Sequence, residues 1–335
     1  MQPQPTNVSP AKIFNTLSAY VQSDALKAAI ELDLFTAVGE GHCTAGDLAR
    51  RCNAAPRGVR ILADYLTVQG FLTKQDDRYG LSEDSAVFLN RSSPAYMGGV
   101  HEFLLSDYLR EGSRTLPEAV RKGGTAIVKN GAVTPEHPMW VAFARAMAPM
   151  MMPIAQQVAA RAGQGRLKAL DIAAGHGIYG ITIATSNPEA RIVQLDWPNV
   201  LQVARENAVK FGVEKRISYI NGSAFTEDYG SDYDLVLLTN FLHHFDPPTN
   251  EALLKKVHAA LKPGGRAITV DFVPNDDRVS PPQAAAFALV MLQTTDSGDA
   301  YTFAEFDRMF RNAGFERSEQ IDLPPSPNSL IVSYR

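Results

Sequence analysis

The 335-residue sequence has few cysteines, no basic excess and no long apolar run. Its two cysteines, Cys43 and Cys52, are too few for a disulfide framework or a cysteine-rich metal site. A net charge of −4 and a pI of about 6.0 give no sign of a nucleic-acid partner, because proteins that bind nucleic acids usually carry a basic patch. No stretch approaches the ~20 apolar residues that span a bilayer, and residues 1–10 lack the pattern of a signal peptide. We therefore expect a cytoplasmic protein with neither a membrane segment nor a metal site.

The remaining composition, 45% hydrophobic and 20% charged, suits packed globular domains, and the length suits two of them. The pattern changes twice along the chain. Residues 1–105 predict helices and a hairpin, residues 106–162 are mostly helical, and residues 163–335 alternate strands with helices. These ranges are the expected domains, with the middle one as a linker that contributes helices to a substrate pocket.

Residues 1–105 show the order of a winged helix. Thr44 is expected to cap a helix over 45–52, a second helix covers 56–69, and 71–81 form two short extended runs around a polar turn. This order also occurs in DNA-binding proteins, where Arg57 and Arg60 would lie on the recognition helix. Acidic residues beside these arginines favour packing and dimerisation instead, and a DNA-binding regulator remains an alternative.

A methionine-rich helix is expected over 135–162. Pro149 and Pro153 should kink or divide it, because a proline inside a helix removes a main-chain hydrogen bond. Methionines usually fill irregular spaces in a core. Because this helix leads directly into the last domain, its methionines could equally form the wall of an apolar pocket.

Residues 163–335 predict a Rossmann-like α/β fold. Strands are expected over 167–173, 191–195, 217–220, 234–239, 266–273 and 329–333, and helices over 175–186, 200–211, 251–261 and 303–313. Strands that alternate with helices in this way form a parallel sheet covered on both faces.

Three turns at strand ends indicate a nucleoside site. The first, residues 170–177, reads Leu-Asp-Ile-Ala-Ala-Gly-His-Gly and lacks the G-x-G-x-x-G of dinucleotide-binding turns. Asp171 there would repel phosphates and suits a cationic group, such as the amino group of a methionine moiety. Asp196 ends the second strand, where a carboxylate binds ribose hydroxyls, and Trp197 is placed to pack on adenine. Residues 221–225 follow the third strand, where the adenine edge would lie. Together these turns predict S-adenosylmethionine.

Two histidines follow the fourth strand. The imidazole of His243 can take a proton from a phenol at neutral pH, and Asp271, at the end of the next strand, is a candidate to orient it. Structural roles for His243, for His244 and for a solvated Asp271 remain open. Metal binding by the histidine pair is disfavoured, because adjacent residues of a strand point to opposite faces.

The chain resembles the small-molecule S-adenosylmethionine-dependent O-methyltransferases typified by the caffeic acid and acetylserotonin enzymes. The resemblance covers nearly the whole chain and rests on segments 170–177, 194–198, 242–245, 261–266 and 301–306. It implies a winged-helix dimerisation domain, a homodimer, His243 as general base braced by Asp271, and S-adenosylhomocysteine as product. The expected cofactor contacts are Asp171, Ala173, Gly175, Gly177, Asp196, Trp197, Ser223, Ala224, Phe225 and Asn240.

One departure from this family concerns a second acid. Plant members carry a glutamate where this chain has Ala300. C-methylation, or non-methylating chemistry on the same fold, therefore stays as an alternative. The substrate pocket is expected to be formed by Phe143, Met147, Met150, His244, Phe287 and Met291, with Leu292 beside them. Their apolar character predicts a small, flat, hydroxylated aromatic acceptor.

Overall fold

The computed structural model describes residues 8–127 and 136–335. Its contacts divide the chain into two compact units, one up to His101 and one over Glu102–Arg335. In the described part, no helix is both long enough and apolar enough to cross a bilayer.

The N-terminal unit has the predicted order of a winged helix. Its elements are α1 (Ala11–Leu17), α2 (Ala19–Glu31), α3 (Leu34–Gly39), α4 (Ala45–Arg51), α5 (Pro56–Val68), β1 (Leu72–Gln75), β2 (Arg78–Leu81), α6 (Glu83–Phe88) and the 3-10 turn η1 (Gly98–Val100). Thr44 caps α4 by accepting a hydrogen bond from the Asp47 N–H at 3.2 Å, as expected. Leu34, Phe35 and Leu48 are fully buried in the core of this unit.

The second unit begins with helices. After α7 (His101–Leu104) come α8 (Asp107–Arg114), α9 (Leu116–Lys122) and α10 (Met139–Ala162). Pro149 and Pro153 were predicted to kink or divide the helix, and the division is wrong, because α10 is one helix of 24 residues. Each proline removes only one main-chain hydrogen bond, and buried residues on both sides, such as Met147 and Ala155, hold the helix against α11 and α12.

A seven-stranded sheet with order β5-β4-β3-β6-β7-β9-β8 forms the centre of this unit. Its strands are β3 (Leu167–Ile172), β4 (Ala190–Asp196), β5 (Ile217–Asn221), β6 (Tyr233–Thr239), β7 (Leu261–Phe272), β8 (Arg317–Asp322) and β9 (Asn328–Tyr334). The first five in spatial order run parallel, but β9 pairs antiparallel with both β7 and β8. The expected parallel sheet is therefore confirmed for β3 to β7, and β8 and β9 add an antiparallel edge to it. The β8 strand has mostly exposed polar residues, so no apolar pattern predicted it. Its connection to β9 is short, and a short connection joins neighbouring strands as an antiparallel hairpin.

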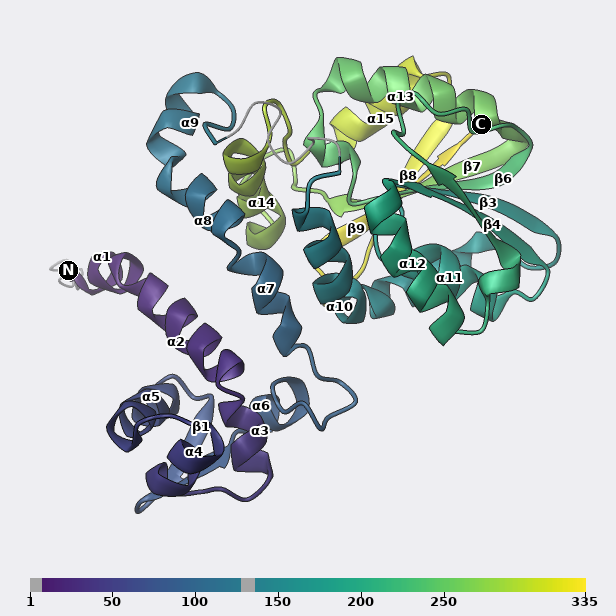
Figure 1. Ribbon diagram of the computed structural model, residues 1–335. Coiled ribbons are helices and arrows are strands. Elements are labelled where there is room, and N and C mark those ends of the chain that lie inside the picture. Colours follow the sequence, from purple (N-terminus) through teal and green to yellow (C-terminus); the bar gives the residue numbers. More distant parts are fainter. Residues whose placement is uncertain (1–7, 128–135) are drawn as a thin grey trace, which may run out of the picture. The chain divides into compact units, whose positions relative to one another are not determined.

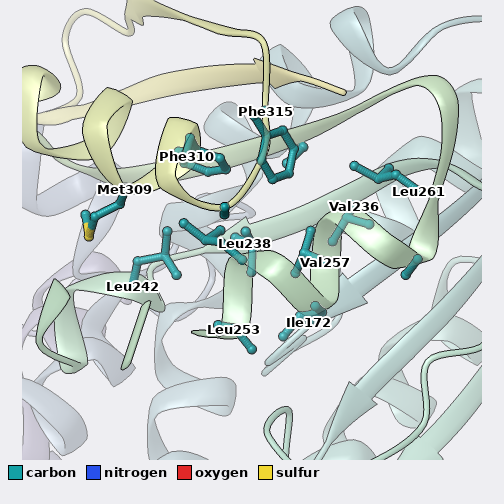
Figure 2. Packing of buried hydrophobic residues seen from close by; sticks show 14 of the residues in the cluster. Ile172, Val236, Leu238, Leu242, Leu253, Val257, Leu261, Met309, Phe310 and Phe315 are labelled. Atoms are coloured by element: carbon teal, nitrogen blue, oxygen red, sulfur yellow. The ribbon is translucent and has the colours of Figure 1, made fainter. Parts of the chain in front are cut away.

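Helices cover both faces of this sheet (Figure 1). The first face carries α11 (Ile178–Ser186) and α12 (Pro198–Lys210) with α10 against them, and the second carries α13 (Pro247–Ala260) and α15 (Phe303–Asn312). The short turn η3 (Glu214–Arg216) precedes β5, and α14 (Pro282–Thr294) follows β7. Side chains from the sheet, from α13 and from the α15 region form one buried cluster (Figure 2); among them are Ile172, Val236, Leu238, Leu253, Val257, Phe310 and Phe315.

The strand order reverses at β3, which lies between β4 and β6. In open α/β sheets, ligands bind at the carboxyl ends of the strands beside such a reversal. The fold therefore places the candidate site after β3, β4 and β6.

Candidate active site

A cavity of about 620 Å³ lies at this reversal, within the usual size range of small-molecule sites. At one end, residues that follow β3, β4 and β5 line it, and at the other end residues that follow β6 and β7. Helices α10 and α14 form its walls. Every lining residue belongs to the second unit.

The turn after β3 forms the first end of the cavity. Ala173 and Gly175 line it, and both adopt left-handed backbone conformations, with φ of 53° and 57°. Gly177 does not line it. A Cβ on Gly177 would lie 2.8 Å from Gln194 Nε2, and this amide donates to the Gly177 carbonyl at 2.9 Å. Gly177 therefore allows the turn to pack closely against Gln194 and does not itself contact the cavity.

Asp196 links this turn to the end of β4. Its Oδ2 accepts a hydrogen bond from the Gly175 N–H at 2.8 Å, and its Oδ1 accepts one from the Trp197 N–H at 2.7 Å. Burial raises the pKa of Asp196 to about 6. The carboxylate still lines the cavity and keeps lone pairs free for a ligand. Trp197, Ser223, Ala224 and Phe225 line the same end.

Asp171 lies elsewhere than the sequence suggested. Its side chain is fully buried beneath the turn and does not line the cavity. Its Oδ2 accepts a hydrogen bond from the Gly180 N–H at 3.2 Å, and burial raises the pKa of Asp171 to about 7. Asp171 is thus a buried residue inside the α/β unit, and the structure does not place it as the expected cofactor contact.

His243 lies at the other end of the cavity, on the 3-10 turn η4 (Leu242–His244). Its Nδ1 lies 2.7 Å from Asp271 Oδ1, and both residues are buried. The same Oδ1 accepts a hydrogen bond from the Phe272 N–H at 2.8 Å. A carboxylate can only accept, so His243 carries its proton on Nδ1, and the Nε2 lone pair is free.

His244 is close to His243 because η4 is not a strand. The two rings are 4.2 Å apart and both residues line the cavity, so the argument that they point to opposite faces is wrong. Burial, and then the charge of His243, lower the pKa of His244 well below its ordinary value. His244 Nδ1 lies 3.2 Å from the Phe241 carbonyl, to which a neutral ring donates, leaving Nε2 as an acceptor. In the described part, no three His, Cys, Asp or Glu residues are grouped as metal ligands.

Aromatic and methionine side chains surround the two histidines. Phe287 of α14 meets His243 edge-on at 4.8 Å and stacks on Phe272 at 3.9 Å, while Trp140 of α10 meets His244 edge-on at 5.3 Å. The α10 side chains that line the cavity include Phe143, Met147, Met150 and Met151, and α14 adds Met291 but not Leu292. Met147, Met150 and Met151 therefore form part of a pocket wall, one of the two roles left open by the sequence, whereas Met152 does not line the cavity.

The sequence did not reveal Asn328, which is buried and lines the cavity. Its Nδ2 donates to Asn240 Oδ1 at 3.3 Å, and Asn240 Nδ2 lies 3.9 Å from Met151 Sδ. Asn328 opens β9, far along the chain from the other site residues, and no local pattern marks it. The cavity-lining residues of α8 were missed for the same reason.

Comparisons with known proteins show the family to which the chain belongs. The family model of the O-methyltransferase domain matches residues 115–316, and that of the O-methyltransferase dimerisation domain matches residues 14–91. The tetracenomycin polyketide synthesis 8-O-methyl transferase TcmO of Streptomyces glaucescens is 28% identical over 313 residues, 91% of each chain. The 3-hydroxy-5-methyl-1-naphthoate 3-O-methyltransferase of Streptomyces sahachiroi is 28% identical over 339 residues, 99% of this chain and 97% of that one. A solved structure of a candidate O-methyltransferase from Nostoc punctiforme is 52% identical, with a TM-score of 0.95, and the match covers 98% of this chain and all of that one.

Proposed function

Because this chain belongs to the S-adenosylmethionine-dependent O-methyltransferase family, we propose that it methylates a hydroxyl group of a small aromatic acceptor with His243 as the general base. One observation carries the proposal: His243, an imidazole oriented through Nδ1 and free at Nε2, and the carboxylate of Asp196 line the same cavity. S-adenosylmethionine supplies a methyl group that is already activated on a sulfonium. The chain then has to hold the acceptor in line, remove its proton and exclude water.

The cofactor end suits a nucleoside linked to an amino acid. Asp196 accepts hydrogen bonds from the ribose hydroxyls, and Trp197 with residues 223–225 forms the adenine pocket. The turn over 173–175 and Asn240 line the passage toward His243. The small side chain of Ala173 and the bare Cα of Gly175 let a ligand approach the backbone closely. S-adenosylhomocysteine is the product that leaves this end.

His243 moves the proton at the other end. Its Nδ1–H donates to Asp271, which fixes the ring and directs Nε2 to the acceptor hydroxyl. The hydroxyl proton passes to Nε2, and the oxygen forms its new bond to the methyl carbon as the carbon–sulfur bond breaks. The buried Asp271 carboxylate stabilises the imidazolium that results.

The acceptor pocket suits a flat, neutral aromatic molecule that carries a hydroxyl group. Phe287, Trp140 and the methionines of α10 offer apolar faces. Neutral His244 offers a second hydrogen-bond acceptor beside His243. The curated relatives named for a naphthoate and for a tetracenomycin polyketide support naphthol-like acceptors.

We further propose a homodimer formed through the N-terminal unit. The match to the dimerisation domain covers residues 14–91. Helices α1 and α2 expose a row of large apolar side chains, of which Ile13, Phe14, Leu17 and Tyr20 are each more than 60% exposed. Monomers rarely leave such a patch uncovered. Phe14→Glu with Leu17→Glu should give a monomer in analytical ultracentrifugation, and a persistent dimer would place the interface elsewhere.

The function is tested by binding and turnover. Calorimetry should detect binding of S-adenosylhomocysteine, and 1-naphthol, 2-naphthol and catechol should gain one methyl group on oxygen, as shown by mass spectrometry and NMR. His243→Ala should abolish most of this turnover without loss of S-adenosylhomocysteine binding. A protein that does not bind S-adenosylhomocysteine refutes the proposal, and methylation at carbon would support the alternative chemistry.

A further inference from the structure

The segment 295–299, which follows α14, contacts the main chain of the proposed base. We name it the α14 brace. The Asp299 N–H donates a hydrogen bond to the His243 carbonyl at 2.9 Å. Within the brace, the Gly298 N–H donates to Thr295 Oγ1 at 2.9 Å. The brace thus holds the backbone of His243, whereas Asp271 holds its ring.

Gly298 allows this approach because it has no side chain. A Cβ at this position would lie 2.3 Å from the His243 carbonyl oxygen and 3.0 Å from the carbonyl carbon of His244. Both contacts are with backbone atoms, which cannot rotate away as the end of a side chain would. Gly298 is not among the glycines with positive φ, so space and not backbone conformation requires glycine here.

The brace is itself fixed to the wall of the acceptor pocket. Thr295, which is buried, donates through Oγ1 to the Met291 carbonyl at 2.7 Å. Thr125 donates through its N–H to the Thr295 carbonyl and through its Oγ1 to the Gln293 carbonyl, both at 2.7 Å. Met291 and Gln293 line the cavity. The acceptor wall and the main chain of His243 are therefore parts of one hydrogen-bonded structure.

We propose that Gly298 is a positioning residue for methyl transfer, which sets the place of His243 through its main chain. This inference rests on the proposed role of His243 as the base. Two contacts position His243: Asp271 fixes the direction of its Nε2 atom, and the brace fixes the position of the η4 main chain relative to the cavity. The brace ends beside Ala300, so a main-chain contact supports His243 next to the position where this sequence has alanine and plant members have glutamate.

The effect of adding one methyl group follows from the distances. Carbon and oxygen come no closer than about 3.3 Å in favourable contacts, so Gly298→Ala forces the brace and the His243 carbonyl apart by about 1 Å. A displacement of this size can cost roughly 100-fold in rate, because the attacking oxygen must be aligned closely. We expect kcat to fall 10- to 100-fold, with the acceptor KM and the dissociation constant of S-adenosylhomocysteine changed less than about threefold.

The first arm of the test is structural and needs no turnover. Crystal structures of the wild type and of Gly298→Ala, both with S-adenosylhomocysteine, should show η4 displaced and the bond from Asp299 to the His243 carbonyl broken. An unmoved His243 overturns the inference. This arm also separates the two proposals. A wild type that does not bind S-adenosylhomocysteine refutes the function, whereas an unmoved His243 in a variant that binds it refutes only the role of Gly298.

The second arm is kinetic and uses 2-naphthol, or whichever of the three phenols the wild type methylates. Gly58→Ala is the matched control, since it adds the same methyl group on α5 where nothing lies within 4 Å, and it should leave kcat unchanged. If Gly298→Ala does not fold, Thr295→Val removes the hydroxyl that accepts the Gly298 N–H. It should lower kcat, and Thr295→Ser, which keeps the hydroxyl, should recover turnover. A loss of thermal stability without a loss of kcat, or an equal loss of cofactor binding, shows a merely structural glycine.

Discussion

Replacing Asp271 by asparagine tests how the proposed base is oriented. The Asp271 Oδ1 atom accepts two hydrogen bonds, from His243 Nδ1 at 2.7 Å and from the Phe272 N–H at 2.8 Å. An asparagine whose NH2 group replaced this oxygen would face two donors. The side chain introduced by Asp271→Asn must therefore keep its oxygen there, and His243 keeps its proton on Nδ1. The variant removes the negative charge and leaves the tautomer intact.

The expected loss follows from the charge alone. A hydrogen bond to a charged group contributes about 1.5–3 kcal/mol and a neutral one about 0.5–1.5 kcal/mol, so the exchange costs roughly 1–1.5 kcal/mol. Losing the attraction between the carboxylate and the imidazolium adds a further ~1 kcal/mol. This is well below the ~4 kcal/mol between two full charges that lie 4 Å apart at an effective dielectric constant of 20. We expect kcat to fall about 10- to 100-fold. Asp271→Ala also frees the tautomer, and its loss should approach the ~10⁴-fold typical of a triad in the wrong tautomer.

The assay is the initial rate of methylation at saturating cofactor and acceptor, with S-adenosylhomocysteine binding as the check on folding. Asp276→Asn is the control, because this acid is exposed and lies a few residues further along the chain. Equal losses in Asp271→Asn and Asp271→Ala would refute the argument about the tautomer. Full activity in Asp271→Asn would refute a role for the charge.

Three further predictions each concern a single side chain. S-adenosylhomocysteine should bind about tenfold more weakly at pH 5 than above pH 7, because the pKa of Asp196 is about 6 and its charged form accepts the ribose hydroxyls; calorimetry on Asp196→Asn should show no such pH dependence. Asp171→Asn should raise the melting temperature at pH 8 more than at pH 5. Burial raises the pKa of Asp171 to about 7, so the buried charge, and the folded-state stability lost with it, appear as pH rises through that value. Weaker S-adenosylhomocysteine binding by this variant would instead support the ligand contact predicted for Asp171. Phe310→Ala should lower the unfolding free energy by about 3–5 kcal/mol in urea, because Phe310 is fully buried against Phe315, and a loss below 1 kcal/mol would contradict this packing.

Much of the fold could be predicted because its signals are local. Thr44 before a helix, and apolar strands alternating with helices, each act within a dozen residues. The errors concern elements whose state depends on distant partners. The proline-containing helix α10 stays whole because α11 and α12 hold it, and β8 is a strand because β9 pairs with it. Neither partner can be inferred from the segment itself.

The site divides in the same way. The two ends of the cavity follow from motifs at strand ends, and the sequence named His243, Asp271 and Asp196 for chemical reasons that the geometry supports. The acceptor wall was found only in part, because α8, α10, α14 and the start of β9 meet there from separate regions of the chain. Gly298 carries no signal in the sequence, since its significance lies in the distance to a carbonyl 55 residues earlier.

Asp171 and Asp196 show what decides whether an acid at a strand end faces a ligand. Both follow apolar residues near the ends of adjacent parallel strands, so their local sequence does not distinguish them. The register separates them: Asp171 pairs with Gln194, while Asp196 lies two residues beyond that level at the end of β4. Asp171 is therefore within the sheet, under the turn, and Asp196 emerges at the cavity. Gly180 leaves space for the inward-packed carboxylate, because a Cβ there would lie 3.0 Å from Asp171 Oδ2 and 2.7 Å from Ile192 Cγ2.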